Sequence, residues 1–255
     1  MASIRLSHVS VSFPVYDVSS RSLKKRLLSS ATGGRIMEDS EGRIPIVQAL
    51  DNLNLTLDHG TKVGLVGHNG AGKTTLLRVL AGIYEPNEGT VDVEGQVAPM
   101  FDQSLGMDPE SSGFENIVLR GLCLGMSKRE IIARTDEIAK FTELGDFLNL
   151  PIRTFSDGMR TRLAFAISTA IQPDILLLDE GIAAGDAAFL AKANKRLEAF
   201  TEQASIIVLA SHSNTLISRM CTSAILLEHG RLLAQGATDE ILAIYAENKG
   251  KSKKQ

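Results

Sequence analysis

The sequence has no tryptophan, and aromatic residues make up only 5% of its 255 residues. Proteins that bind single-stranded nucleic acid stack the bases on aromatic side chains, so this scarcity argues against such a surface. The net charge is −3, from 27 basic and 30 acidic side chains, and gives no general attraction to a phosphate backbone. Nucleic acid is therefore not an expected partner.

A long apolar run and a cysteine framework are also missing. No stretch reaches the roughly 18 to 20 apolar residues that span a bilayer, and the N-terminus lacks the apolar core of a secretory signal. The two cysteines, Cys123 and Cys221, are far apart and form no C-x-x-C pair. We expect a cytoplasmic chain with two reduced, structural thiols.

The hydrophobic content of 44% over this length is sufficient for one large α/β domain. Its apolar patterns predict strands that alternate with helices, and therefore a mainly parallel sheet in an αβα arrangement. The expected strands are 4–13, 53–57, 62–66, 175–178 and 206–210, with a hairpin at 224–233, and the expected helices are 73–80, 159–171, 187–200 and 239–248. The first strand is expected to be antiparallel.

Three segments interrupt or extend this pattern. Residues 106–159 turn helical, with helices expected at 114–122 and 128–141 and a short piece near Asp146, and predict an inserted helical subdomain. The whole is expected to be one domain, whose bounds are 1–248, with a core at about 1–105 and 160–248, an arm at about 14–47 and a disordered basic tail at 249–255.

Within the arm, residues 21–28 place leucines on one side of a helix and four basic groups on the other. Two interpretations stay open: this helix lies on an anionic membrane surface, or it packs on its own domain. The short tail is not expected to form a sugar-binding pocket, so we expect this subunit not to recognise a glycan.

A glycine-rich segment follows the buried strand 62–66. Residues 67–74, G-H-N-G-A-G-K-T, fit G-x-x-x-x-G-K-[ST] between a strand and a helix, which is the context that phosphate binding requires. The glycines let the N–H groups of residues 69–74 turn inward around phosphates, and the helix N-terminus adds a positive dipole end. Lys73 is expected to reach the β- and γ-phosphates, Thr74 to hold Mg²⁺, and Thr75 to contact the α-phosphate.

Two adjacent carboxylates, Asp179 and Glu180, follow the apolar strand 175–178. Ligands of open α/β sheets bind at the carboxyl ends of the strands. We expect Asp179 to hold the Mg²⁺ shell and Glu180 to polarise the attacking water, because phosphoryl transfer depends on positioning and charge compensation.

His212 follows another strand end in the same sheet, from which it can reach a γ-phosphate. The other histidines, His8, His59, His68 and His229, are expected to have structural side chains. Ser156 precedes the helix at 159–171 and is expected near its N-cap, which makes a second helix terminus suited to an anion. We infer that its phosphate comes from another subunit.

The order of these motifs resembles the ABC nucleotide-binding domain over nearly the whole chain. Residues 155–159, F-S-D-G-M, resemble the signature L-S-G-G-Q of that family, and His212 resembles its switch histidine. Gln103 lies twelve residues before Glu115, as the glutamine of the Q-loop does. By the same resemblance Phe13 stacks on adenine, with Tyr16 as the reserve candidate.

The resemblance implies a P-loop NTPase fold with an antiparallel β subdomain, ATP and Mg²⁺ as cofactors, and a homodimer with shared ATP sites. The implied catalytic residues are Glu180, His212 and Gln103, and the metal ligands are Thr74, Gln103 and Asp179. The implied nucleotide contacts are Phe13, Gly67, His68, Asn69, Gly70, Ala71, Gly72, Lys73, Thr74, Thr75, Ser156 and Gly158.

The chain departs from the family pattern at Asp157, Met159 and Gly181. An acidic group repels a γ-phosphate, so we expect the Asp157 side chain to point away from it. The long arm, the S-G-F-E-N-I segment at 112–117, the non-glycine signature and A-G-D at 184–186 together resemble polysaccharide exporters. That resemblance implies a lipid-linked O-antigen, capsule or teichoic-acid chain as cargo, an integral-membrane permease as partner, and peripheral attachment to the cytoplasmic face of the bacterial inner membrane.

Three other classes are weaker alternatives. A soluble ABC ATPase of DNA repair or translation usually carries two cassettes or a long coiled-coil insertion, which this sequence lacks. A small-molecule kinase would use Lys73 and Asp179 but would leave the signature and His212 without a role. The third alternative is the ATPase of another ABC transporter, an importer or a drug or lipid exporter; a nutrient importer would be distinguished mainly by lacking the arm.

Overall fold

The computed structural model describes residues 1–15, 35–38, 45–101, 104–179 and 187–252. Contacts divide the chain into two compact units, one formed by Met1–Glu94 with Ile206–Gln255 and the other by Gly95–Ser205. Several predicted features lie outside the described residues: Tyr16, the basic helix at 21–28, Gln103, Glu180, Gly181 and residues 184–186.

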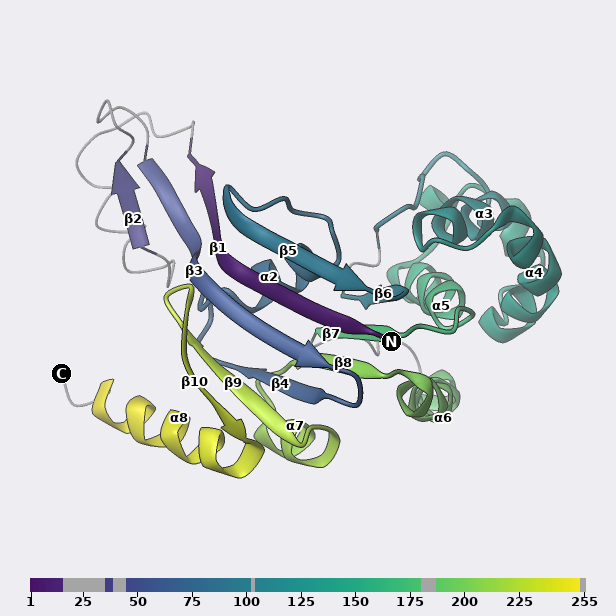
Figure 1. Ribbon diagram of the computed structural model, residues 1–255. Coiled ribbons are helices and arrows are strands. Elements are labelled where there is room, and N and C mark those ends of the chain that lie inside the picture. The colour runs from purple at the N-terminus through teal and green to yellow at the C-terminus, as the bar shows by residue number, and fades with distance from the viewer. Residues whose placement is uncertain (16–34, 39–44, 102–103, 180–186, 253–255) are drawn as a thin grey trace. The chain divides into compact units, whose positions relative to one another are not determined.

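The first unit contains an antiparallel sheet in the order β2-β3-β1-β5 (Figure 1). Its strands are β1 (Ser3–Pro14), β2 (Arg35–Glu38), β3 (Pro45–Asp58) and β5 (Glu88–Glu94). Leu6 of β1 lies opposite Leu55 of β3 and Val91 of β5, so apolar residues of three strands share one face. The predicted antiparallel opening strand is confirmed.

A second sheet of the same unit carries parallel strands. β4 (Lys62–Val66) lies between β8 (Ile206–Ala210) and β9 (Ser223–Glu228), parallel to both, and β10 (Arg231–Ala237) pairs antiparallel with β9. Strands buried on both faces have continuous apolar sequences, as β8 does. Helix α2 (Lys73–Leu80) contacts β3 and β5 of the first sheet and β8 of the second.

Two helices follow the strands of the second sheet, α7 (Asn214–Met220) and α8 (Thr238–Ser252), and α8 runs beside β9 and β10 (Figure 1). α7 approaches β4 so closely that a Cβ atom at Gly64 would lie 2.5 Å from Ile217 Cγ2. A glycine in the middle of this strand is therefore required by packing.

The second unit combines a parallel strand pair, β6 (Val97–Met100) and β7 (Ile175–Asp179), with the helices. These are α3 (Gly113–Cys123), α4 (Lys128–Thr142), α5 (Asp157–Ser168) and α6 (Ala187–Gln203), with short 3₁₀ turns at Gly145–Asn149 and Ile152–Thr154. α3, α4 and α5 contact one another (Figure 1). The helical segment predicted at 106–159 lies within this unit.

Capping explains where the first two of these helices begin. The Ser112 and Ser127 hydroxyls each accept a backbone N–H three residues later, and Glu115 and Glu130 accept the N–H of their serine in return. These two hydrogen bonds form the capping box. Bonds from the serine side chain and backbone lower the pKa of Glu115 and of Glu130.

The structure differs from the sequence prediction at several places. α5 begins at Asp157 instead of Met159, because Ser156 caps it, and ends at Ser168 instead of Ile171. The prediction of a disordered tail from residue 249 is wrong as far as Ser252, where α8 ends. The strands β2, β5 and β6 and the helix α7 were not predicted.

Two other sequence expectations concern membranes and thiols. Among the described residues, no helix combines the length and the apolar character needed to cross a membrane. Both cysteines are free, with Cys123 exposed and Cys221 buried. Burial raises the pKa of the Cys221 thiol to about 12, which keeps it protonated and unreactive at neutral pH.

Candidate functional site

The glycine-rich loop lies between β4 and α2 of the first unit, as the sequence predicts. Gly67, Gly70 and Gly72 have φ angles of 156°, 79° and 107°, which side chains with a Cβ rarely adopt. A Cβ at Gly67 would lie 2.3 Å from the Leu227 carbonyl oxygen, and one at Gly72 would lie 2.8 Å from that of Ala49. Glycine is therefore required for two reasons: the turn needs these φ angles, and the neighbouring backbone leaves no room for a side chain.

Lys73 closes this loop. Its Nζ donates hydrogen bonds to the carbonyl oxygens of Gly67, at 2.6 Å, and of His68, at 3.2 Å, and the residue is only 8% exposed. Gly72, the N-cap of α2, has no side chain to accept the first helical N–H groups. A buried ammonium group and the positive end of a helix dipole thus meet at one loop, which is an electrostatic setting for an anion such as phosphate.

The turn between β9 and β10 supports the loop from outside. Gly230 donates its N–H to the Ala71 carbonyl at 3.0 Å and accepts the N–H of Asp51 at 2.9 Å. Arg231 forms an ion pair with Asp51, with 2.6 Å between Nη2 and Oδ2. This support was not predicted from the sequence, because it joins three segments that are far apart along the chain.

His212 lies at the same sheet edge as the loop. Leu65 of β4 is paired with Ala210 of β8, and Gly67 and His212 each follow two residues after these partners. His212 is exposed. Its predicted place after a parallel strand is confirmed, and its contact with a γ-phosphate stays a prediction.

Phe13, the predicted adenine-stacking residue, lies near the end of β1 and is 36% exposed. An edge-to-face contact joins its ring to that of Tyr84, with 5.2 Å between centroids and 65° between planes. Tyr84 Oη accepts a hydrogen bond of 2.9 Å from Arg78 Nη1 at the end of α2. Tyr84 is an aromatic partner that the sequence analysis missed.

In the second unit, Asp179 is the half-buried last residue of β7, parallel to β6. Its place at the carboxyl end of a buried parallel strand is as predicted, and an aspartate there is suited to hold a divalent cation. Glu180 and Gln103, the predicted base and the predicted Q-loop residue, lie outside the described residues.

Ser156 caps α5, and its Oγ accepts the N–H of Met159 at 3.3 Å. The Asp157 carboxylate is 96% exposed and forms an ion pair with Arg160 at 2.5 Å. A cavity of about 450 Å³ adjoins this helix start and is lined by Glu143, Leu144, Phe147, Ser156, Gly158, Met159 and Arg162. At the signature segment, the N-terminus of α5 therefore borders an open cavity.

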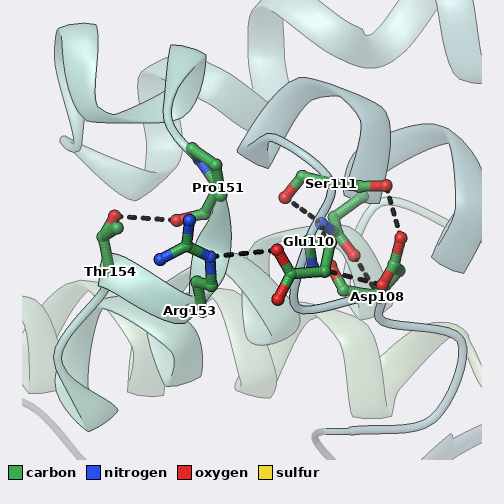
Figure 2. Close-up of polar contacts among 7 residues, drawn as sticks. Asp108, Glu110, Ser111, Pro151, Arg153 and Thr154 are labelled. Carbon is green, nitrogen blue, oxygen red and sulfur yellow. Dashed lines mark hydrogen bonds and ion pairs between the residues drawn. The ribbon is translucent and has the colours of Figure 1, made fainter.

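Hydrogen bonds hold the segment that leads into this cap (Figure 2). Arg153 Nε donates to Glu110 Oε2 at 3.0 Å, and Thr154 Oγ1 donates to the Pro151 carbonyl at 2.7 Å. Ser111 Oγ donates to Asp108 at 2.6 Å, and this bond lowers the pKa of that carboxyl. The residues before α3 and those before α5 therefore support each other.

Comparison with known proteins agrees with this geometry. The sequence profile of the ABC transporter family matches residues 50–183. The chain is 48% identical to the O-antigen export system ATP-binding protein of Yersinia enterocolitica over 230 residues, which cover 90% of this chain and 96% of that protein. It is 36% identical to the teichoic acids export ATP-binding protein of Bacillus anthracis, over 96% of this chain and 42% of that longer protein.

The fold is also that of solved ABC cassettes. The dimeric, post-hydrolysis structure of the ATP-binding cassette MJ0796 with ADP and phosphate aligns with a TM-score of 0.64 at 22% identity, over 92% of this chain and 98% of that one. The resemblance to polysaccharide exporters predicted from the sequence is confirmed by the relatives named above. The chain therefore belongs to the ABC transporter family, as one of its ATP-binding and ATP-hydrolysing subunits.

Proposed function

We propose that this chain hydrolyses ATP as one of a pair of identical subunits and thereby powers the export of a lipid-linked polysaccharide. The observation that carries the proposal is the glycine loop closed by the buried Lys73 ammonium group. A side chain at Gly67 or Gly72 would clash with neighbouring backbone atoms, so the folded loop requires glycine at both positions.

Each residue of the first unit has a role that follows from its chemistry. The Lys73 ammonium compensates the charge of the β- and γ-phosphates, and the N–H groups at the start of α2 bind phosphate oxygens. The exposed part of the Phe13 ring, held at its edge by Tyr84, stacks on adenine. A ring N–H of His212 donates a hydrogen bond to the γ-phosphate at the neighbouring strand end.

Thr74 and Asp179 fit the needs of Mg²⁺, since a hydroxyl and a carboxylate are the hard oxygen ligands that this ion prefers. Bound with ATP, the ion neutralises the negative charge that develops during phosphoryl transfer. Glu180, which follows Asp179 directly, orients and polarises the attacking water.

The second copy supplies Ser156. The starts of α2 and α5 are each suited to bind a phosphate. One γ-phosphate does not bind two helix starts of the same chain, so the start of α5 is left for the phosphate of the other copy. The cavity beside Ser156 leaves this helix start open to an anion from outside the unit, and the ion pair with Arg160 compensates the Asp157 carboxylate, which would otherwise repel that anion. MJ0796, which shares the fold, is dimeric in its ADP-bound structure.

Export of a polysaccharide is supported by the relatives, which are named for O-antigen and teichoic-acid export. A subunit of this kind works beneath a permease on the cytoplasmic face of the inner membrane. The basic segment 21–28 would then lie near anionic lipid headgroups.

Co-purification tests this assignment. The chain is isolated in detergent together with its permease partner, and the bound lipid is identified by mass spectrometry. We expect a polyisoprenyl-linked glycan and an ATPase rate that rises when it is added. A complex that contains no lipid-linked glycan and whose ATPase rate responds to a nutrient or a drug would contradict polysaccharide export.

A further inference from the structure

Three side chains capable of binding a metal ion gather beside the glycine loop. His68 belongs to the loop itself, Glu228 ends β9, and His229 follows in the turn to β10. One ligand atom of each lies within 4.8 Å of the other two, and the two imidazole centroids are 5.0 Å apart. The sequence analysis gave neither histidine side chain a functional role, because residues 68 and 229 meet only in the folded chain.

His68 is oriented as metal-binding histidines are. Its Nδ1 lies 2.8 Å from the carbonyl oxygen of Asn69, which can only accept, so Nδ1 is the donor, and in the neutral imidazole Nε2 is then the nitrogen with the lone pair. Nε2 is buried and has no hydrogen-bond partner in the part of the chain that the structure describes. A histidine that ligates through one nitrogen almost always donates the other N–H to an acceptor such as this carbonyl.

His229 stands at an unusual backbone position. The loop between Glu228 and Arg231 has two residues, His229 and Gly230, with φ angles of 49° and 80°. Such a turn prefers asparagine, aspartate or glycine at both places, and histidine is one of the few other residues that are enriched at a positive φ. This turn places the imidazole of His229 against that of His68.

We propose that His68 Nε2, the Glu228 carboxylate and a ring nitrogen of His229 bind a divalent transition metal of the zinc class. The site is separate from that of the Mg²⁺ that accompanies ATP. Two imidazoles and one carboxylate suit Zn²⁺, Co²⁺ or Ni²⁺, whereas Mg²⁺ prefers oxygen ligands throughout. Tetrahedral zinc bonds of about 2.0 to 2.1 Å set their ligand atoms roughly 3.4 Å apart, so the three ligand atoms, which lie within 4.8 Å of one another, would move closer together when the ion binds.

Metal bound here would join the loop to its outer support. His68 follows Gly67, whose carbonyl accepts the Lys73 ammonium, and His229 precedes Gly230, which donates to Ala71. The two segments already share one hydrogen bond, and a metal would cross-link them a second time. We therefore expect the loop to open less often when the metal is bound.

The test uses the full chain with any affinity tag removed, in buffer without nucleotide or Mg²⁺. Zn²⁺ is titrated by calorimetry, and Co²⁺ is followed by its visible absorption, which is strong for tetrahedral sites. We expect one ion per chain, and at least tenfold weaker binding in Glu228→Gln and in His229→Asn. Asparagine suits the turn, so the second variant should fold normally; thermal unfolding without metal checks both.

His59→Asn is the matched control, because His59 is an exposed histidine in the turn between β3 and β4. Its Zn²⁺ affinity should equal that of the wild type, and excess Mg²⁺ should not displace the bound Zn²⁺ or Co²⁺. The wild type should also show slower hydrogen exchange at residues 67–75 when Zn²⁺ is present. Absence of Zn²⁺ binding to the wild type, or wild-type affinity in both variants, would overturn the proposal, as would displacement by Mg²⁺.

Discussion

The ammonium group of Lys73 lies 2.6 Å from the carbonyl oxygen of Gly67, the residue at the opposite end of the loop. One hydrogen bond thus connects the first residue after β4 to the first residue of α2. The bond positions a charge of +1 within the curve of the loop, where the phosphates of ATP would lie. The loop and the Lys73 ammonium group are therefore one structural unit. Removal of the Lys73 side chain is the most direct test of what the cation contributes.

Lys73→Ala should weaken ATP binding by roughly 10- to 100-fold, since charge-assisted hydrogen bonds contribute about 1.5 to 3 kcal/mol. Titration with a fluorescent ATP analogue measures the change. Lys128→Ala removes an exposed lysine at the start of α4 and serves as the control, with unchanged affinity. Equal affinity in the Lys73 and Lys128 variants would show that this ammonium group does not bind the nucleotide.

Gly67→Ala should destabilise the fold more than Gly60→Ala. Both glycines have positive φ angles, but a Cβ at Gly60 meets no atom within 4 Å, whereas one at Gly67 would lie 2.3 Å from the Leu227 carbonyl oxygen. The left-handed conformation alone costs about 1 kcal/mol, and the steric clash adds to it. Urea unfolding of the two variants compares these costs, and equal losses of free energy would refute the steric argument.

Ser156→Ala separates capping from catalysis. Ser156 and Ser127 each accept a backbone N–H at 3.3 Å at a helix start, so both alanine variants should lose about 1 kcal/mol of unfolding free energy. Only the Ser156 variant should lose ATPase activity, by roughly tenfold, because only this hydroxyl would also bind a phosphate. The rate is measured at saturating ATP, and equal rates in the two variants would leave Ser156 as a cap and nothing more.

The capping box of α4 predicts a pH dependence of stability. Bonds from Ser127 hold the pKa of Glu130 below its ordinary value of 4.5, so the native state stabilises the carboxylate. This contribution is fully present above the unfolded-state pKa and is lost as the pH falls through the folded-state pKa. Glu130→Gln should therefore differ most from the wild type at pH 6 to 7 and least near pH 3.

Urea unfolding at a series of pH values measures this difference in free energy. Lys128→Ala, which leaves both partners of the box in place, is the control and should follow the wild-type pH profile. A gap between wild type and Glu130→Gln that widens as the pH falls would contradict the predicted sign.

The sequence predicts the loop at residues 67–75 well, because its glycines and lysine are local requirements of one strand–loop–helix unit. It also places Asp179 and His212, since each directly follows a short apolar run. It does not predict that Tyr84 contacts Phe13, or that Gly230 supports Ala71, because these pairs form only through tertiary packing. Helix α5 begins at Asp157, earlier than predicted, because the Ser156 side chain caps it with a hydrogen bond. The spacing of apolar residues along the sequence does not reveal such a bond.

Strand β5 was missed for a different reason. Its burial alternates between exposed and half-buried residues, and Gly89 in its second position weakens any strand signal. A Cβ on that glycine would lie 2.4 Å from the carbonyl oxygens of Ser7 and His8, so the residue is set by its contact with β1. Edge strands of this kind depend on their neighbour more than on their own apolar pattern.

The central claim, that two copies of this chain enclose ATP between them, is tested most directly by the molar mass of Glu180→Gln. This variant keeps the binding residues but lacks the carboxylate that would activate water, so the ATP-bound pair should accumulate. Light scattering after gel filtration in ATP and Mg²⁺ should give twice the monomer mass of 27.4 kDa, and the monomer mass without nucleotide. A monomer in saturating ATP, together with ATP hydrolysis at the wild-type rate, would contradict the account.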